Sequence, residues 1–183
     1  MFLFLVACAS SSAPTTPLPK RTDSVAAAPV KAVKTDEFCE VRPNKAFVWP
    51  EMDAPPPAAA AGWRWVNVWA TWCKPCVAEM LMLSKWQERL GSQGVSVDLQ
   101  FLSVDADTAA LASYVSAHAE AKGSGHLKDM KLLPDWLAAV GLDASAVLPV
   151  HLFIDPTNTI QCERMGSLGE EDYDVVKRVL QGQ

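Results

Sequence analysis

Two kinds of apolar pattern follow one another along the chain. Residues 64–70 form a run rich in Trp and Val, which is typical of a buried strand, and residues 74–90 place apolar side chains at helical spacing. A second strand is expected at 95–104 and an alanine-rich helix at 108–121. Glycines mark the expected helix ends, namely Gly91, Gly123 and Gly141. Strand, helix and strand in this order predict a βαβ unit.

The rest of the chain adds further strands and helices. A short helix is expected at 134–141, a hairpin of two strands at 150–155 and 159–165, and a last helix at 170–180. Phe47-Val48-Trp49 adds an edge strand before the first long strand. The order of elements predicts an α/β fold, with a central mixed sheet flanked by helices and a short N-terminal edge-strand extension.

The first 35 residues follow neither pattern. The apolar run that ends in Leu5-Val6-Ala7-Cys8 resembles the lipobox of bacterial lipoproteins, which implies a signal peptide at 1–7, cleavage before Cys8 and lipidation of its thiol. Residues 8–35, rich in Pro, Ala and Ser, then form a disordered tether, and residues 36–183 form the folded domain. No Lys or Arg precedes the apolar run, so we expect the true start to lie upstream. The alternative is a frayed terminus with an incidental cysteine.

Composition excludes some functions. The chain has 183 residues, a net charge of -5 and no basic stretch interleaved with aromatic residues, so it lacks the electrostatic footprint of a nucleic-acid-binding protein. No apolar run reaches the ~20 residues of a membrane-spanning helix. One compact domain with a non-globular N-terminal segment fits these numbers.

The candidate chemistry lies in the segment Trp72-Cys73-Lys74-Pro75-Cys76, where the first strand gives way to the first long helix. Two cysteines at this spacing can close a small ring or open to a dithiol, and the free N–H groups of a helix start stabilise the Cys73 thiolate. Pro75 suits an early helical position because it lacks an N–H group. Half a zinc site would need a second C-x-x-C or a His pair, and the sequence has neither.

Residues 66–80 resemble the active-site segment of thioredoxin-fold proteins, specifically of the TlpA/ResA-like membrane-tethered thiol-disulfide oxidoreductases. Asn67 and Glu79 mark that subgroup. The similarity extends over about 45–181, where Leu148-Pro149-Val150 resembles the cis-proline loop of the family. The resemblance implies a thioredoxin fold and dithiol-disulfide exchange that needs no cofactor and no metal.

The resemblance also implies the role of each catalytic residue. Cys73 attacks a substrate disulfide, and Cys76 then resolves the mixed disulfide. Glu79 lies one helical turn beyond Cys76 and exchanges a proton with its thiol, the alternative being an acid that is merely favoured near a helix start. Pro149 is expected to be cis and to bring the backbone of residue 148 beside the sulfurs, where an incoming peptide can pair with it.

Other residues near the motif are expected to modulate it. Trp72 forms a flat wall beside the disulfide, and Lys74, which replaces the more usual Gly, Pro or Glu, adds local positive charge or is simply solvated. His151 raises the alternative of a copper site made with Cys73 and Cys76, although a packed or surface histidine is the preferred interpretation.

The remaining cysteines indicate the cellular compartment in which the protein folds. Lipidation of Cys8 leaves four of the five cysteines, and the C-x-x-C motif leaves Cys39 and Cys162. Two such thiols often pair in an oxidising compartment, so a structural disulfide is expected between them.

These observations predict an extracytoplasmic thiol-disulfide oxidoreductase that reduces protein disulfides. We expect a monomer, anchored by its lipid to the periplasmic face of a bacterial membrane, the outer rather than the inner, and supplied by a membrane electron donor. The alternative is a thioredoxin-fold copper chaperone that uses the same two cysteines. A Cu(I) titration separates the two.

Overall fold

The computed structural model describes residues 34–58 and 61–183. The signal peptide predicted at 1–7, the lipidated Cys8 and nearly all of the tether predicted at 8–35 lie outside the described residues. Helix α1 (Thr35–Phe38) begins at the last residue of the range predicted for the tether.

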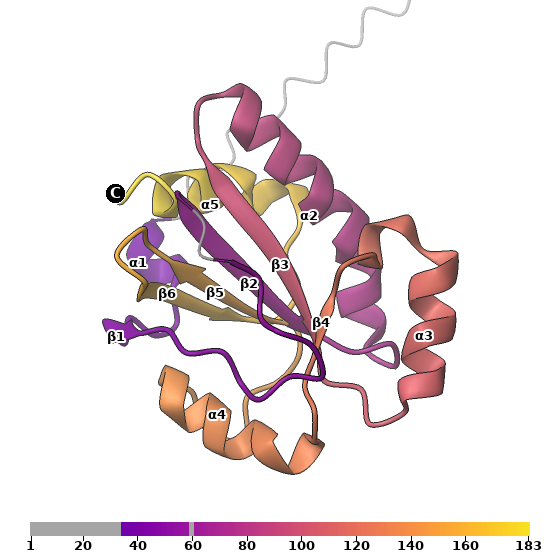
Figure 1. Ribbon diagram of the computed structural model, residues 1–183. Helices are drawn as coiled ribbons and strands as arrows, with labels where there is room; N and C mark the ends of the chain where they lie inside the picture. Colours follow the sequence, from indigo (N-terminus) through magenta and orange to yellow (C-terminus); the bar gives the residue numbers. More distant parts are fainter. Residues whose placement is uncertain (1–33, 59–60) are drawn as a thin grey trace, which may run out of the picture. The chain divides into compact units, whose positions relative to one another are not determined.

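Six strands of the described residues form one mixed sheet in the order β1-β6-β5-β2-β3-β4 (Figure 1). They are β1 (Lys45–Ala46), β2 (Trp63–Trp69), β3 (Val97–Ser103), β4 (Gly125–His126), β5 (Val150–Ile154) and β6 (Thr159–Met165). Strands β2 and β3 are parallel, which confirms the βαβ unit, and β5 and β6 form the antiparallel hairpin. The predicted mixed sheet flanked by helices is therefore confirmed.

The helices pack on both faces of the sheet (Figure 1). After α1 they are α2 (Lys74–Ser92), α3 (Thr108–Ala117), α4 (Leu133–Val140) and α5 (Tyr173–Val179). Helices α2 and α5 share one face, where the Trp86 and Tyr173 rings pack edge to face with centroids 5.3 Å apart. Helix α4 lies on the other face, and its Trp136 Nε1 donates a hydrogen bond to the Val48 carbonyl at 2.8 Å.

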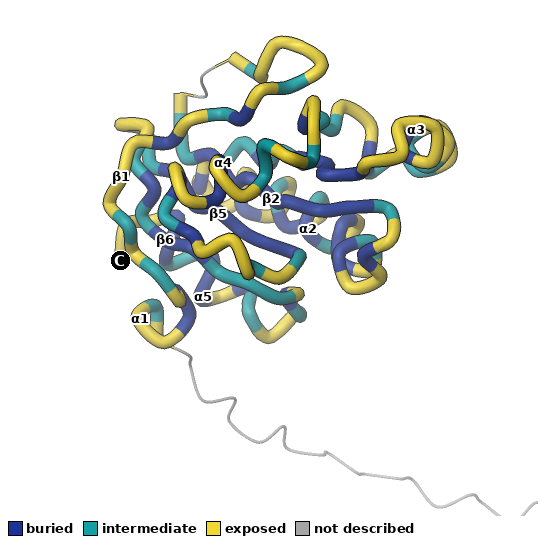
Figure 2. Tube along the Cα trace, turned by 90° about the horizontal axis from the view of Figure 1, so that it is seen from below, coloured by how far each residue is buried: buried dark blue, intermediate teal, exposed yellow. Residues whose placement is uncertain are grey.

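Strand β2 lies in the middle of the sheet and is buried from Arg64 to Trp69, which appears as dark blue in Figure 2. Successive side chains of a strand point to opposite faces. Asn67 therefore reaches α2, where it meets Glu79, whereas Val68 lines a pocket with Leu133 and Leu137 on the α4 side. One face of β2 therefore supplies Asn67 to the buried polar contact with Glu79, and the other supplies Val68 to the pocket.

Two predicted helix ends are wrong. Helix α2 continues through Gly91 to Ser92, and the chain turns at Gly94, whose φ of 78° is left-handed. Helix α3 ends at Ala117 rather than at residue 121, because His118 takes an extended conformation while its ring stacks on Tyr114 with centroids 3.9 Å apart. A 3-10 turn, Ala119–Ala121, completes that segment before Gly123.

The last helix also differs from the prediction. A 3-10 turn, Glu170–Asp172, precedes α5, so the single helix expected at 170–180 is two segments. The Gly169 N–H donates a hydrogen bond to Asp172 Oδ2 at 2.9 Å, which caps the start of this turn. The polarity of the segment, acidic at its start and basic at its end, is as predicted.

The outer strands of the sheet were poorly predicted. The edge strand is Lys45–Ala46 rather than residues 47–49, because the chain bends after Phe47 and packs Phe47 and Trp49 around the Arg64 guanidinium at 6.0 and 5.6 Å. Strand β4 was not predicted at all. Its Gly-His sequence has no β pattern, and only pairing with β3 makes it a strand.

A disulfide joins Cys39, the residue after α1, to Cys162 of β6. The two Cα atoms are 5.2 Å apart, within the range that a disulfide requires, and the cysteines are 123 residues apart in sequence. The crosslink therefore attaches the entry segment of the domain to its sheet and closes a very long loop.

We predict that replacing both Cys39 and Cys162 by Ser lowers the free energy of unfolding by about 2–4 kcal/mol, since the unfolded chain gains the entropy of an open loop. Urea unfolding of the two proteins measures the difference. Mild reduction followed by alkylation and mass spectrometry should open Cys73–Cys76 first, because the Cys73 sulfur borders a surface pocket. Earlier alkylation of Cys39 and Cys162 would contradict a structural role.

Candidate active site

The C-x-x-C motif occupies the junction between β2 and α2. Cys73 is the N-cap residue of α2, and its Sγ accepts a hydrogen bond from the Cys76 N–H at 3.4 Å. Pro75 lies in the first turn, where its missing N–H has no intrahelical partner. Cys73 and Cys76 form a disulfide with Cα atoms 5.3 Å apart, so the helix start holds the pair in one small ring.

The turn before Cys73 is held by Asp105, a residue to which the sequence analysis gave no role. The Thr71 N–H and hydroxyl both donate to the Asp105 carboxylate, the hydroxyl at 2.6 Å, and the Ser103 hydroxyl donates to it at 2.8 Å. Asp105 follows β3, and the carboxyl ends of parallel strands meet at one edge of a sheet. That rule, applied to the predicted βαβ unit, would have placed Asp105 near the motif.

Glu79 lies beneath the motif and is only 3% exposed. The Asn67 side-chain amide donates to its Oε1 at 2.9 Å, and the Leu168 N–H donates to its Oε2 at 2.7 Å. Burial, with a smaller contribution from the nearby Asp172 carboxylate, raises the pKa of Glu79 to about 7 against the opposing effect of the two hydrogen bonds. The carboxyl group can therefore gain or lose a proton near neutral pH.

His151 is a packed histidine, as preferred in the sequence analysis, and its side chain is fully buried. Its position on β5 directly opposite Asn67 of β2 brings it under the motif. The Trp65 indole N–H donates to His151 Nδ1 at 3.2 Å, and His151 Nε2 lies 3.4 Å from Glu79 Oε1. Burial lowers the pKa of His151 to about 3, so the ring is neutral.

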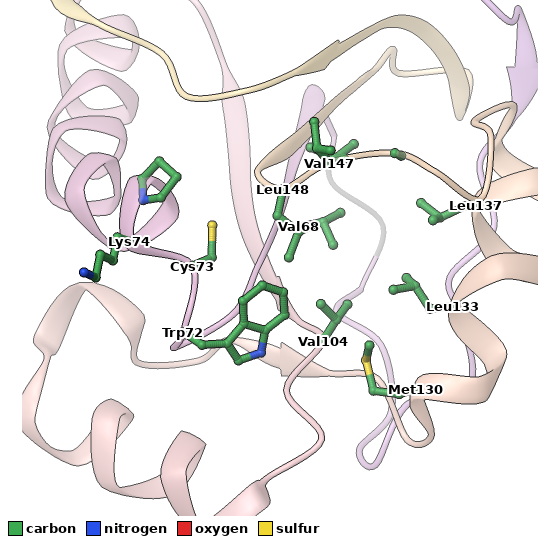
Figure 3. Close-up of a pocket in the computed structure, with 13 residues that line it drawn as sticks. Val68, Trp72, Cys73, Lys74, Val104, Met130, Leu133, Leu137, Val147 and Leu148 are labelled. Carbon is green, nitrogen blue, oxygen red and sulfur yellow. The ribbon is translucent and has the colours of Figure 1, made fainter.

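A pocket of about 620 Å³ opens beside Cys73 (Figure 3). In Figure 3 Trp72 and Cys73 lie on one side of it, and Leu133 and Leu137 of α4 face them from the other. The lining is almost entirely apolar, and the exposed indole of Trp72 stands at its rim as the expected wall. Lys74 is exposed beside the pocket.

The loop before β5 completes the pocket. The peptide bond between Leu148 and Pro149 is cis, and the Leu148 side chain lines the same pocket as Cys73. The exposed Val147 borders the pocket next to Leu148. The backbone before Pro149 is thus beside the redox pair, where the sequence analysis expected it.

The structure brings together most of the expected site residues. Trp72, Cys73 and Pro75 line one pocket. Cys76 is bonded to Cys73 and is fully buried, and Pro149 follows Leu148 of the pocket lining. Cys8 lies outside the described residues. Within the described ranges, no group of three or more His, Cys, Asp or Glu side chains is placed to hold a metal ion.

A helix-capping C-x-x-C disulfide and a cis-proline loop at the same pocket, carried by a mixed sheet between helices, define a thioredoxin-like fold. No protein-family model matches the chain, and no curated protein sequence matches it. Solved structures do match, among them thiol-disulfide oxidoreductases and a thiol:disulfide interchange protein.

Three of these structures illustrate the likeness. The thioredoxin domain of a thiol-disulfide oxidoreductase from Bacteroides vulgatus has a TM-score of 0.51 at 15% identity, over 66% of this chain and 80% of that one. A putative thiol:disulfide interchange protein DsbE from Chlorobium tepidum has a TM-score of 0.52 at 16% identity, over 67% and 79%. A putative thiol-disulfide oxidoreductase, also from Bacteroides vulgatus, has a TM-score of 0.51 at 19% identity, over 66% and 79%. The likeness confirms the thioredoxin-like fold.

Proposed function

We propose that this protein is a thiol-disulfide oxidoreductase that reduces the disulfides of protein substrates through Cys73 and Cys76. The observation that carries the proposal is the Cys73–Cys76 disulfide at the start of α2, bordering an apolar pocket. The thiol-disulfide oxidoreductases that share the fold support it.

The first half-reaction belongs to Cys73. Its sulfur borders the pocket and faces the Cys76 N–H at the helix start, so its thiolate is both accessible and stabilised. The thiolate attacks one sulfur of a substrate disulfide, and the Cys73–substrate bond forms as the substrate disulfide breaks. The departing substrate thiolate takes a proton from solvent.

The second half-reaction belongs to Cys76 and Glu79. Cys76 is fully buried, and a buried thiol needs a nearby base to lose its proton. Glu79, one turn further along α2, accepts that proton. The Cys76 thiolate then attacks Cys73 Sγ and releases the second substrate sulfur as a thiolate, which takes a proton from solvent. Two electrons pass to the substrate, and the Cys73–Cys76 disulfide remains.

The pocket suits polypeptide substrates whose disulfides are flanked by apolar side chains. The pocket is lined by Val68 of β2, Val104 after β3 and Val150 of β5, together with Leu133 and Leu137 of α4. An extended peptide paired with the backbone at Leu148 would place alternate side chains in this apolar space. Burial of such side chains favours binding, whereas a charged side chain would lose its hydration there.

We predict that Cys73→Ala abolishes disulfide reductase activity, whereas Cys76→Ser accumulates a mixed disulfide with the substrate, because only the resolving step is lost. Insulin reduction measures activity, and non-reducing electrophoresis shows the trapped complex. Faster alkylation of Cys76 than of Cys73 in the reduced protein at neutral pH would reverse the assignment. Tight binding of one Cu(I) with no reductase activity would favour the copper-chaperone alternative.

We predict that Glu79→Gln slows resolution by Cys76 about 10²-fold or more at neutral pH, while the attack by Cys73 stays within a few-fold of wild type. In the wild type, resolution should accelerate as pH rises through about 7, because Glu79 must be ionised to accept a proton. The variant should lose this pH dependence. Stopped-flow measurement separates the two phases, and equal slowing of both would indicate a general effect on folding or electrostatics.

We infer that the protein is lipid-anchored through Cys8 at the periplasmic face of a bacterial membrane, the outer rather than the inner, and receives electrons from a membrane donor. The structural disulfide Cys39–Cys162 supports an oxidising compartment outside the cytoplasm. Among the described residues, no helix is long and apolar enough to span a membrane. The anchor proposal rests on the resemblance of residues 5–8 to a lipobox.

We predict that detergent, but not high salt, releases the protein from membranes, because salt weakens electrostatic contacts and does not extract acyl chains from a bilayer. Cys8→Ser should yield protein in the soluble fraction with unchanged reductase activity. Fractionation followed by mass spectrometry of the N-terminal peptide checks this. An unmodified Cys8 in cells would contradict the anchor and leave the proposed redox activity untouched.

A further inference from the structure

Three side chains form a buried row under the active-site motif. Trp65 comes from β2, His151 from β5 and Glu79 from α2, and none of the three is more than 3% exposed. The Trp65 Nε1 to His151 Nδ1 distance is 3.2 Å, and the His151 Nε2 to Glu79 Oε1 distance is 3.4 Å. We call these residues the Trp65–His151–Glu79 row.

The row fixes the position of the imidazole proton. An indole N–H can only donate a hydrogen bond, so His151 Nδ1, which faces it, must offer a lone pair. The Asn67 amide nitrogen, 3.3 Å from the same Nδ1, is a second donor. Because burial keeps the ring neutral, its one proton is on Nε2. The hydrogen-bonding partners of His151 therefore select a single tautomer.

Two groups lie near the imidazole N–H. The backbone at Gly166 forms a hydrogen bond with the ring, and Glu79 Oε1 lies 3.4 Å from Nε2. Of the two, only the Glu79 carboxyl group changes its charge, and an N–H group gains most from a neighbour that becomes negatively charged. The N–H is therefore placed to favour the carboxylate over the carboxylic acid.

We propose that His151 is a positioning residue that holds its Nε2 proton toward Glu79, stabilises the Glu79 carboxylate and thereby sets the pH at which Glu79 can accept the Cys76 proton. The inference rests on the proposed role of Glu79 in resolution. In this proposal His151 affects the redox cycle only by changing how readily Glu79 takes up a proton. It has no direct role at the sulfurs of Cys73 and Cys76.

Other groups around the row also influence its charge. Glu79 faces the Asn67 amide from β2, the Leu168 N–H from the loop after β6 and the Asp172 carboxylate from the 3-10 turn before α5. His151 faces the positive charge of Arg164 from β6, which opposes protonation of the ring. None of these groups is altered in the variants below, so a change in the titration of Glu79 reports on His151.

Two substitutions distinguish the role of Nδ1, which faces Trp65, from the role of Nε2, which faces Glu79. His151→Asn keeps a short side chain that can accept the Trp65 hydrogen bond and loses the group that reaches Glu79. His151→Gln keeps an N–H group at the distance of Nε2. The side-chain carboxyl band of Glu79 is followed by infrared spectroscopy against pH in the oxidised protein, where the thiols do not titrate. Glu79→Gln identifies the band.

We expect His151→Asn to move the midpoint of the Glu79 titration upward by about one pH unit, the size of a weak hydrogen bond to a charge. His151→Gln should stay within a few tenths of a pH unit of wild type. An unchanged midpoint in His151→Asn, or equal upward shifts in the two variants, would overturn the proposal.

Trp65→Phe gives an independent test that leaves His151 in place. Without the indole donor only the Asn67 amide still favours a lone pair on Nδ1, so part of the protein can take the other tautomer and present a lone pair to Glu79. A lone pair there favours the protonated acid, so the midpoint should rise, and by less than in His151→Asn. A fall or no change would contradict tautomer selection by Trp65. The infrared titration does not depend on turnover. It therefore distinguishes failure of this inference from a loss of the proposed reductase activity.

Discussion

The placement of the site depends on one constraint, the burial of β2 on both faces between α2 and α4. Because successive side chains of a strand point in opposite directions, Asn67 is directed to the buried polar side and Val68 to the apolar pocket. The end of the same strand delivers Cys73 to the start of α2. A slip of one residue in the register of β2 would exchange the two faces and dismantle the site.

Two buried carboxyl groups, Glu79 of α2 and Glu163 of β6, reach a similar pKa with different partners. Burial raises the pKa of each to about 7. Hydrogen bonds from Asn67 and Leu168 oppose the rise at Glu79. Neither carboxyl oxygen of Glu163 has a hydrogen-bond partner among the described residues, and the positive charge of Lys45 opposes the rise there.

The two disulfides likewise differ through their surroundings. Cys73–Cys76 closes a ring of four residues at a helix start and borders a pocket, which suits repeated opening and closing. Cys39–Cys162 joins segments 123 residues apart, and both cysteines are buried in the core. The Cys73–Cys76 disulfide is therefore suited to thiol-disulfide exchange, whereas the Cys39–Cys162 disulfide attaches the entry segment to the sheet.

The sequence by itself determined the features that arise from neighbouring residues: the βαβ unit, the hairpin at β5 and β6, the helix start at Cys73 and the position of Glu79 one turn beyond Cys76. Each depends on local periodicity or on spacing of a few residues. The two-residue strands β1 and β4 and the end of α3 were missed because pairing and packing, not local pattern, create them. The contacts of Thr71 with Asp105 and of Trp65 with His151 join residues 34 and 86 positions apart. Only the register of β2 against β3 and β5 decided them, because that register sets which distant side chains share a face.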